Sequence, residues 1–327
     1  MAIPNIDTLY ECGSTLSAAK AADYAKVRNH QIFIFQFQKS AVHIWSSKFD
    51  FFFQYEGQYK TILLGVKSQD TNTKKLSSQF ISRFFAKFPN LANQALDAIL
   101  DLCEDEDVDI RKQAIKDLPS LCREMKEFLP KIADVLSQLL QSEDKNEIVV
   151  IQNSLMSLFR RDAKGTLIGL FSQVRNGGDV VRDRALKFLH LKLKTEGSEL
   201  IASKDTEAVL LDEIKHSIED CTADEFHMFM SMLGATCLPK TISGQSMIVE
   251  LIAHSCQLDK FDAGDEEAVD RFLACASSAL PYFSVSLYNY FVKFNLIAHC
   301  SKSQIFVQKV QNIFPSFSSN LFSTICS

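Results

Sequence analysis

Residues 102–121 read LCEDEDVDIRKQAIKDLPSL, and they are the clearest indicator of the fold. Its first half is acidic. Its second half places apolar side chains three or four residues apart, on one face of a helix; these are Ile110, Ala114, Leu118 and Leu121. Carboxylates just before a helix favour the positive end of its dipole and can cap free backbone N–H groups. The stretch therefore predicts an acidic turn that leads into an amphipathic helix.

The signature recurs along the chain. It consists of a β-branched residue, an arginine, an alanine and a leucine, namely Ile110, Arg111, Ala114 and Leu118 in one copy and Val181, Arg182, Ala185 and Leu189 in another. Weaker copies place Lys75 and Ile151 at the arginine position. Positions 75, 111, 151 and 182 are 36, 40 and 31 residues apart, which is the period of stacked helical hairpins. The sequence predicts an all-α, HEAT/armadillo-type right-handed α-solenoid, with an ordinary helical bundle as the alternative.

Composition agrees with an intracellular helical protein. The 327 residues are 46% apolar and 23% charged, enough for a sizeable core. A net charge of −5 does not fit the broad basic face of a sequence-independent nucleic-acid binder. The nine cysteines form no CxxC pair, so we expect reduced thiols. No apolar run reaches the roughly 18 residues of a membrane span.

The domain organisation is interrupted in two places. We expect a first helix in residues 1–27 and helical repeats forming one domain over 55–284, with helices including 76–88, 91–103 and 163–174. Between them, residues 28–54 form an insert with seven phenylalanines, in which the alternation at 32–37 is typical of a strand. Residues 285–327 form a Phe- and Ser-rich tail without an acidic residue.

Both unusual segments have the ends of introns when read through the genetic code. Val27-Arg28 fits GTAAGA, Val285-Ser286 fits GTAAGT, and residues 51–54 fit a pyrimidine tract that ends in CAG. Our hypothesis is that 28–54 and 285–327 are translated introns; a lineage-specific insertion is the alternative for the first. A transcript that joins the codons of Lys26 and Tyr55 would support it, and the absence of such a junction in every tissue would refute it.

Four long motifs resemble a known family. QFISRFFAKFP (79–89), LDLCEDEDVDIRKQAIKDLP (100–119), DAKGTLIGLFSQV (162–174) and VVRDRALKFLHLKLKT (180–195) resemble the N-terminal half of the apoptosis inhibitor five family. The resemblance covers residues 1–27 and 55–284. It implies a HEAT-like half, followed by an armadillo-like half and a basic nuclear-targeting tail, both of which we expect this chain to lack. It also implies a non-enzymatic scaffold that regulates programmed cell death through protein partners, in the nucleus, the cytoplasm or both.

Two groups of residues are candidate protein-binding sites. The first is the acidic turn with its arginine, which could dock a basic partner or could be a solvated helix cap: Glu104, Asp105, Glu106, Asp107, Asp109 and Arg111. The second has the LxxLL spacing of peptide-docking helices, although core packing is the alternative: Leu136, Leu139 and Leu140. The acidic turn does not match a calcium-binding loop, because Ile110 and Lys116 stand where such a loop requires glycine and glutamate.

The sequence lacks the common short motifs of nucleotide-binding sites, serine hydrolases and zinc proteases. It contains no GxGxxG, GxxxxGK[ST], GxSxG or HExxH pattern. We therefore predict no catalytic, cofactor-binding or metal-binding residues, and partners that are proteins rather than small-molecule substrates, membranes or nucleic acid. The alternative function is a HEAT-repeat adaptor or transport-type solenoid, which would bind a cargo protein and a small GTPase.

Overall fold

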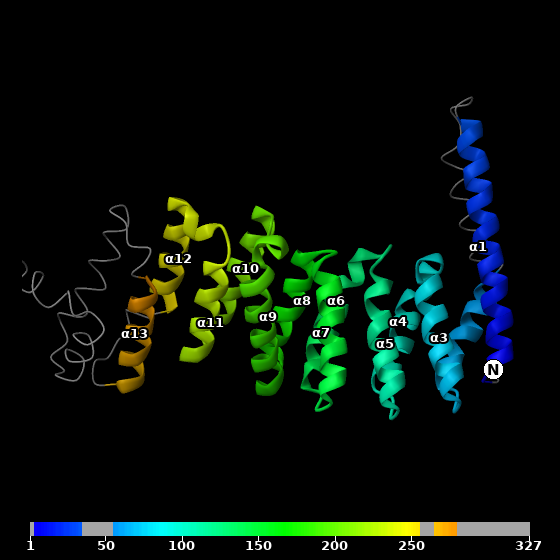
Figure 1. The fold of residues 1–327 in the computed structure, drawn as a ribbon, viewed down its shortest axis with the longest axis horizontal. Helices are drawn as coiled ribbons and strands as arrows, with labels where there is room; N and C mark the ends of the chain where they lie inside the picture. Colours follow the sequence, from blue (N-terminus) through cyan, green and yellow to red (C-terminus); the bar gives the residue numbers. More distant parts are fainter. Residues whose placement is uncertain (1–2, 35–54, 256–264, 280–327) are drawn as a thin grey trace, which may run out of the picture. The chain divides into compact units, whose positions relative to one another are not determined.

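A computed structural model describes residues 3–34, 55–255 and 265–279. Every regular element in these ranges is an α-helix or a 3₁₀-helix (Figure 1). The predicted all-α helical-repeat fold is therefore confirmed. Among the described residues, no helix is long and apolar enough to cross a membrane.

The first helix, α1 (Ile6–Ile34), continues into the Phe-rich insert. The strand predicted at residues 32–37 is thus wrong for 32–34, and 35–37 lie outside the described residues. A lone strand would leave its backbone N–H and C=O groups without partners, whereas a helix pairs them within the segment. The rest of the insert and all of the tail 285–327 also lie outside the described residues.

The chain divides into two compact units, residues 1–169 and 170–327. The boundary falls within α8 (Ala163–Asn176). No linker marks it in the sequence, which predicted one domain over 55–284. In a repeat fold each helical hairpin contacts only its neighbours in the sequence. Such a fold can therefore separate into two compact units between neighbouring repeats without a flexible linker.

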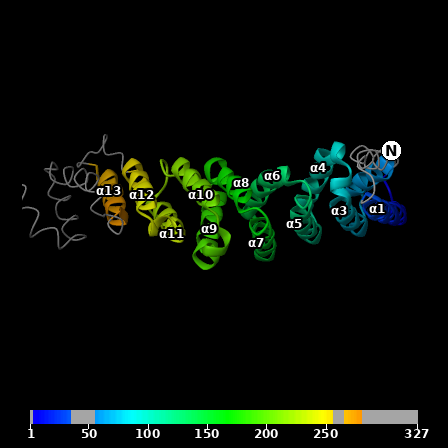
Figure 2. The same cartoon turned by 90° about the horizontal axis from the view of Figure 1, so that it is seen from above.

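Unit 1 contains two rows of helices (Figure 2). Its elements are α1, a helix over residues 55–64, η1 (Gly65–Lys67), α3 (Thr71–Phe84), η2 (Phe85–Lys87), η3 (Pro89–Leu91), α4 (Ala92–Cys103), α5 (Val108–Leu121), η4 (Lys126–Phe128), α6 (Leu129–Gln138), η5 (Leu139–Gln141) and α7 (Lys145–Phe159). Helices α1, α3, α5 and α7 pack side by side in sequence order, with α4 and α6 behind them. Inside, Tyr59 stacks on Phe88 with ring centroids 4.4 Å apart, and its hydroxyl donates to the Ile81 carbonyl at 3.1 Å.

Unit 2 repeats this arrangement. After the end of α8 its elements are α9 (Asp179–Leu200), α10 (Lys204–Ser217), α11 (Ala223–Gly234), η6 (Leu238–Lys240), α12 (Ile242–Ser255) and α13 (Glu266–Ala279). Helix α11 packs against both α9 and α13, and α12 packs against η6 and α13. The buried rings of Phe171 and Phe229 stack with centroids 6.4 Å apart.

Side-chain caps fix where several helices begin. Asp70, Asp107 and Asp144 accept backbone N–H groups at the starts of α3, α5 and α7. Because of the first of these caps, α3 begins at Thr71, earlier than the predicted residue 76. Thr222 and Glu225 form a capping box at α11, in which each side chain bonds the other residue's backbone N–H. The first turn of each of these helices is therefore held in place locally.

Candidate protein-interaction site

The acidic turn before α5 is folded onto itself. The Asp107 carboxylate accepts the backbone N–H of Asp109 at 2.8 Å, and Asp105 accepts that of Asp107 at 3.0 Å. The other Asp105 oxygen pairs with the ammonium of Lys74 on α3, and Asp109 lies 3.9 Å from that of Lys75. These three aspartates thus cap α5 and connect it to α3.

The Arg111 side chain binds the backbone of the same turn on its inward-facing side. Its Nη1 donates to the carbonyls of Asp105 and Glu106 at 2.8 and 3.1 Å. Its Nε donates to Oε1 of Glu147 on α7 at 2.8 Å. One side chain therefore fixes the turn before α5 and connects α5 to α7.

Glu147 is the least exposed carboxylate of this site, with 4% of its surface accessible. It is the third residue of α7, and its second oxygen accepts the Ser142 hydroxyl at 2.5 Å. Next to it, Lys112 pairs with the α7 cap Asp144 at 3.4 Å, closer to solvent. Because both Glu147 oxygens have donors, the buried charge is compensated.

Unit 2 contains the same arrangement at α9. Nε and Nη2 of Arg182 donate to the two oxygens of Glu225 at 2.7 and 3.1 Å, and Nη1 donates to the Val174 carbonyl at 3.1 Å. Nη2 also lies 3.3 Å from Asp220. Glu225 is the third residue of α11, as Glu147 is of α7. The two arginines of the repeat signature therefore have equivalent structural roles.

The other signature residues are core residues. All six are buried, with at most 4% of their surface accessible: Ile110, Ala114, Leu118, Val181, Ala185 and Leu189.

The structure corrects the register of the two weaker copies. Arg111 and Arg182 are the fourth residues of their helices. The fourth residue of α3 is Lys74, not the predicted Lys75. Lys74 makes the closer ion pair, with Asp105 in the turn before α5, whereas Lys75 lies 3.9 Å from Asp109 of α5. In α7 the fourth residue is Ile148, and the predicted Ile151 is a buried core residue. The side-chain caps Asp70 and Asp144 set this register, and the spacing of apolar residues alone does not show it.

Electrostatics reinforce these contacts. The hydrogen bond to Glu147 raises the pKa of Arg111, and that to Glu225 raises the pKa of Arg182. Backbone hydrogen bonds, first from Asn146, lower the pKa of Asp144. Burial raises the pKa of Asp105, but its hydrogen bonds and the positive charges of Lys74 and Arg111 outweigh burial and leave it below the ordinary value. These groups therefore favour their charged forms in the fold.

Little of the acidic turn remains for a partner. Glu104 and Glu106 are exposed, and no side-chain contact within the described part of the chain engages their carboxylates. Asp105 has only 11% of its side chain accessible. A basic partner would therefore meet Glu104, Glu106 and the outer edge of Asp109, whereas Arg111 faces inward.

The LxxLL residues lie at the end of α6 and in η5. Leu136 and Leu140 have 0% and 1% of their surface accessible, and Leu139 is half-buried. Two of the three leucines therefore pack inside unit 1, where a partner could reach them only after local unfolding.

The sequence interpretation missed Lys74, Glu147 and Glu225. A signal existed for the two glutamates, because each stands three residues after a capping residue, Asp144 or Thr222. No comparable signal identified Lys74. Within the described ranges, no group of three or more His, Cys, Asp or Glu side chains is placed to hold a metal ion.

The comparisons with known proteins agree with the motifs. The family described as apoptosis inhibitory protein 5 (API5) matches residues 46–319. The protein named "Apoptosis inhibitor 5" from Homo sapiens is 47% identical over 237 residues, which cover 72% of this chain and 44% of that protein. "Apoptosis inhibitor 5-like protein API5" from Oryza sativa subsp. japonica is 36% identical over 254 residues, covering 73% and 46%.

The chain thus spans less than half the length of these two relatives. Among solved structures, a C-terminal fragment of the Chaetomium thermophilum cohesin loader SCC2 is 11% identical, with a TM-score of 0.38, and the match covers 80% of this chain and 23% of that one. That likeness is too small to carry an argument about this chain.

Proposed function

The chain belongs to the apoptosis inhibitory protein 5 family, and from this premise we propose that it is a non-enzymatic scaffold that restrains programmed cell death by binding other proteins. The named relatives are inhibitors of apoptosis, which supports the direction of the effect. Because the chain spans less than half of these relatives, the proposal concerns the activity of this helical-repeat portion alone.

The observation that carries the proposal is the set of charged contacts between successive helices. Each of these contacts connects one helix to the next helix of the same row, or to the turn before that next helix: Lys74 to Asp105, Arg111 to Glu147 and Arg182 to Glu225. Such contacts fix the spacing and rotation of neighbouring repeats. Exposed side chains along a row then keep constant positions, which is what a surface for a protein partner requires.

The proposal is tested in cells of the organism that carries the gene. Depletion of the transcript should raise the fraction of cells that die under a mild death stimulus, counted with a membrane-impermeant DNA dye. Re-expression of this chain from a depletion-resistant gene should lower that fraction again. An unchanged dying fraction at matched protein levels would rule out the proposed activity for this portion.

The same cells distinguish the alternative role. An adaptor or transport-type solenoid would leave the dying fraction unchanged and would alter the distribution of a cargo protein instead. We also propose that the chain is located in the nucleus, the cytoplasm or both, which a fluorescent fusion of the full chain tests. Family membership favours the cell-death role over cargo transport.

A further inference from the structure

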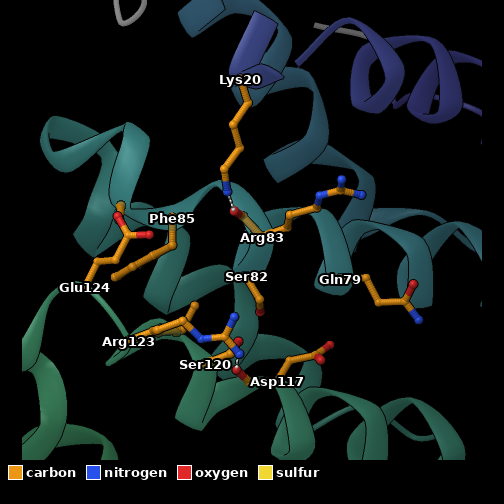
Figure 3. A pocket seen from close by; sticks show the side chains of 11 residues that line it. Lys20, Gln79, Ser82, Arg83, Phe85, Asp117, Ser120, Arg123 and Glu124 are labelled. Atoms are coloured by element: carbon orange, nitrogen blue, oxygen red, sulfur yellow. Dashed lines mark hydrogen bonds between the residues drawn. The ribbon is translucent and has the colours of Figure 1, made fainter. Parts of the chain in front are cut away.

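A polar pocket of about 380 Å³ opens on unit 1, away from the Arg111 contacts. Three helices and the turn after α5 line it, contributing Lys20 from α1, Ser82 and Arg83 from α3, Asp117 from α5, and Arg123 and Glu124 from the turn (Figure 3). This volume is large enough for a charged side chain together with part of the chain that bears it.

Among the residues that the structure describes, cations outnumber carboxylates around this pocket. Lys20, Arg83 and Arg123 line it, against Asp117 and Glu124. Among the described residues, neither Arg83 nor Arg123 forms a side-chain hydrogen bond or an ion pair. Arg83 only lies against the Phe84 ring, 5.7 Å from its centroid. The two guanidinium groups therefore retain their N–H donors for a ligand.

Lys20 reaches across the pocket from α1. Figure 3 shows its ammonium pointing at the backbone of Arg83, where it donates to the carbonyl oxygen at 3.4 Å. Burial lowers the pKa of Lys20, and the neighbouring charges of Lys87, Arg83 and Arg123 lower it further, while Glu124 acts in the opposite direction. Within the described ranges, the positive charges here are thus not fully neutralised by carboxylates.

The Asp117 carboxylate competes weakly for these cations because its oxygens already have donors. The Ser78 hydroxyl donates to Oδ2 at 2.6 Å, and the Gln113 amide contacts both oxygens at 3.1 Å. Glu124 is exposed and is the one other carboxylate that the described residues contribute to the lining. Among these residues, an incoming anion therefore has one exposed competitor.

Ser82 provides a second, independent observation at this pocket. Its Oγ is buried and has no hydrogen-bond partner among the described residues. Ser82 lines the pocket between Arg83 and Asp117 in the view of Figure 3. A buried hydroxyl without a partner destabilises a fold, so such groups normally meet a partner, a water molecule or a ligand.

We propose that this pocket binds the phosphate group of a phosphoserine or phosphothreonine in a partner protein. Two arginines and a lysine can donate to three phosphate oxygens, and the Ser82 hydroxyl supplies a further donor. A phosphate carries close to two negative charges at neutral pH, so it competes better with Glu124 than a carboxylate does. Arginine clusters are a recurrent means of reading phosphorylated peptides. This inference rests on the proposed scaffold function and specifies the chemistry of one partner.

The test uses the purified full chain and three bead-bound peptide libraries with degenerate flanking positions. The fixed central residue is phosphoserine in one library, serine in the second and glutamate in the third. The phosphoserine library should retain the protein at least about tenfold better than either of the others, and less so at high salt. Equal retention on the serine or glutamate library, or retention on none, would overturn the proposal.

Two double variants locate the binding. Arg83→Gln/Arg123→Gln should weaken binding to a selected phosphopeptide at least about tenfold. Lys131→Gln/Lys145→Gln removes the same charge from exposed positions of α6 and α7 in unit 1 and should bind as the wild type does. If the two double variants lose affinity equally, the effect is one of net charge and the pocket is not the site.

Ser82→Ala gives a result that damage to the fold would not produce. It removes the unpartnered hydroxyl, so the free protein should melt at the same temperature or higher, while phosphopeptide binding weakens. Unchanged binding would remove Ser82 from the site and overturn the geometry proposed here. If no library selectively retains the protein but re-expression of the chain still lowers cell death, only the phosphate site is refuted. If the phosphoserine library retains the protein but re-expression leaves cell death unchanged, only the cell-death role is refuted.

Discussion

Arg111→Met tests the role of the charged contacts most directly. The substitution keeps an unbranched apolar side chain but removes the Nε donor to Glu147 and the Nη1 donor to the carbonyls of the preceding turn. Among the described residues, Glu147 then keeps only the Ser142 hydroxyl as a side-chain donor, in a position where 6% of its side chain is accessible. The variant therefore leaves a nearly buried charge without its counter-charge.

The expected loss of unfolding free energy is about 3 kcal/mol. Removing one partner of a buried ion pair costs roughly 3 to 5 kcal/mol. We take the lower end because 22% of the Arg111 side chain is accessible, so water can partly solvate the exposed face of the site. This loss is a large part of the stability of a typical domain, roughly 5 to 15 kcal/mol.

Urea unfolding at pH 7, followed by far-ultraviolet circular dichroism, measures the change. Lys112→Met is the matched control, since this cation is the next residue of α5, has 21% of its side chain accessible and also pairs with α7. Its partner Asp144 has 31% of its side chain accessible, so the control should lose less than about 1 kcal/mol.

A double variant separates the loss of the Arg111–Glu147 ion pair from other effects of the Arg111 substitution. In Arg111→Met/Glu147→Gln the buried charge is absent, and at least about 1 kcal/mol of the loss should return. Equal losses for Arg111→Met and Lys112→Met, or no recovery in the double variant, would refute the assignment of Arg111 to a buried structural pair.

Three further predictions concern unit 1 and use the same unfolding measurement. Burial raises the pKa of Asp117, so its ionised form destabilises the fold above the ordinary carboxyl pKa of about 3.9. Asp117→Asn should therefore stabilise at pH 7, on the order of 1 kcal/mol, and the gain should vanish below pH ~3; a gain that persists there would contradict this cause. A Cβ on Gly169 would lie 2.3 Å from a backbone carbonyl of α6, so Gly169→Ala should cost about 1 to 3 kcal/mol. Gly57→Ala, with open space around it, should be neutral or stabilising. Leu136→Ala should cost about 2 to 5 kcal/mol and Leu139→Ala less; two neutral results would mean that the LxxLL leucines are not core residues.

Helices were predictable from the sequence because their determinants are local. The spacing of apolar residues gave α4 as 91–103 and α8 as 163–174, within two residues of Ala92–Cys103 and Ala163–Asn176. The capping box at α11 is also a local feature, because Thr222 and Glu225 lie only three residues apart. The alternation at 32–37 misled because a short apolar run fits both a strand and a helix, and only the available backbone partners decide between them.

The candidate site was predicted in part. The sequence located the acidic turn and both signature arginines, since these recur at a repeat period. It did not show that Arg111 points inward to Glu147, because that contact joins residues on different helices. A residue's partner across a helix interface depends on how the helices pack, and one position along a helix rotates a side chain by roughly 100°.

The helical class, the repeat period and the family follow from the amino-acid sequence, because local patterns and motifs specify each of them. The pairing of the charges and the position of the pocket follow from how the helices pack. Lys20, Ser82 and Arg123 are remote from one another in the sequence and line one cavity only because α1, α3 and α5 pack side by side. The physical reason is that helix formation depends on neighbours along the chain, whereas a binding site depends on the packing of helices that the chain itself separates.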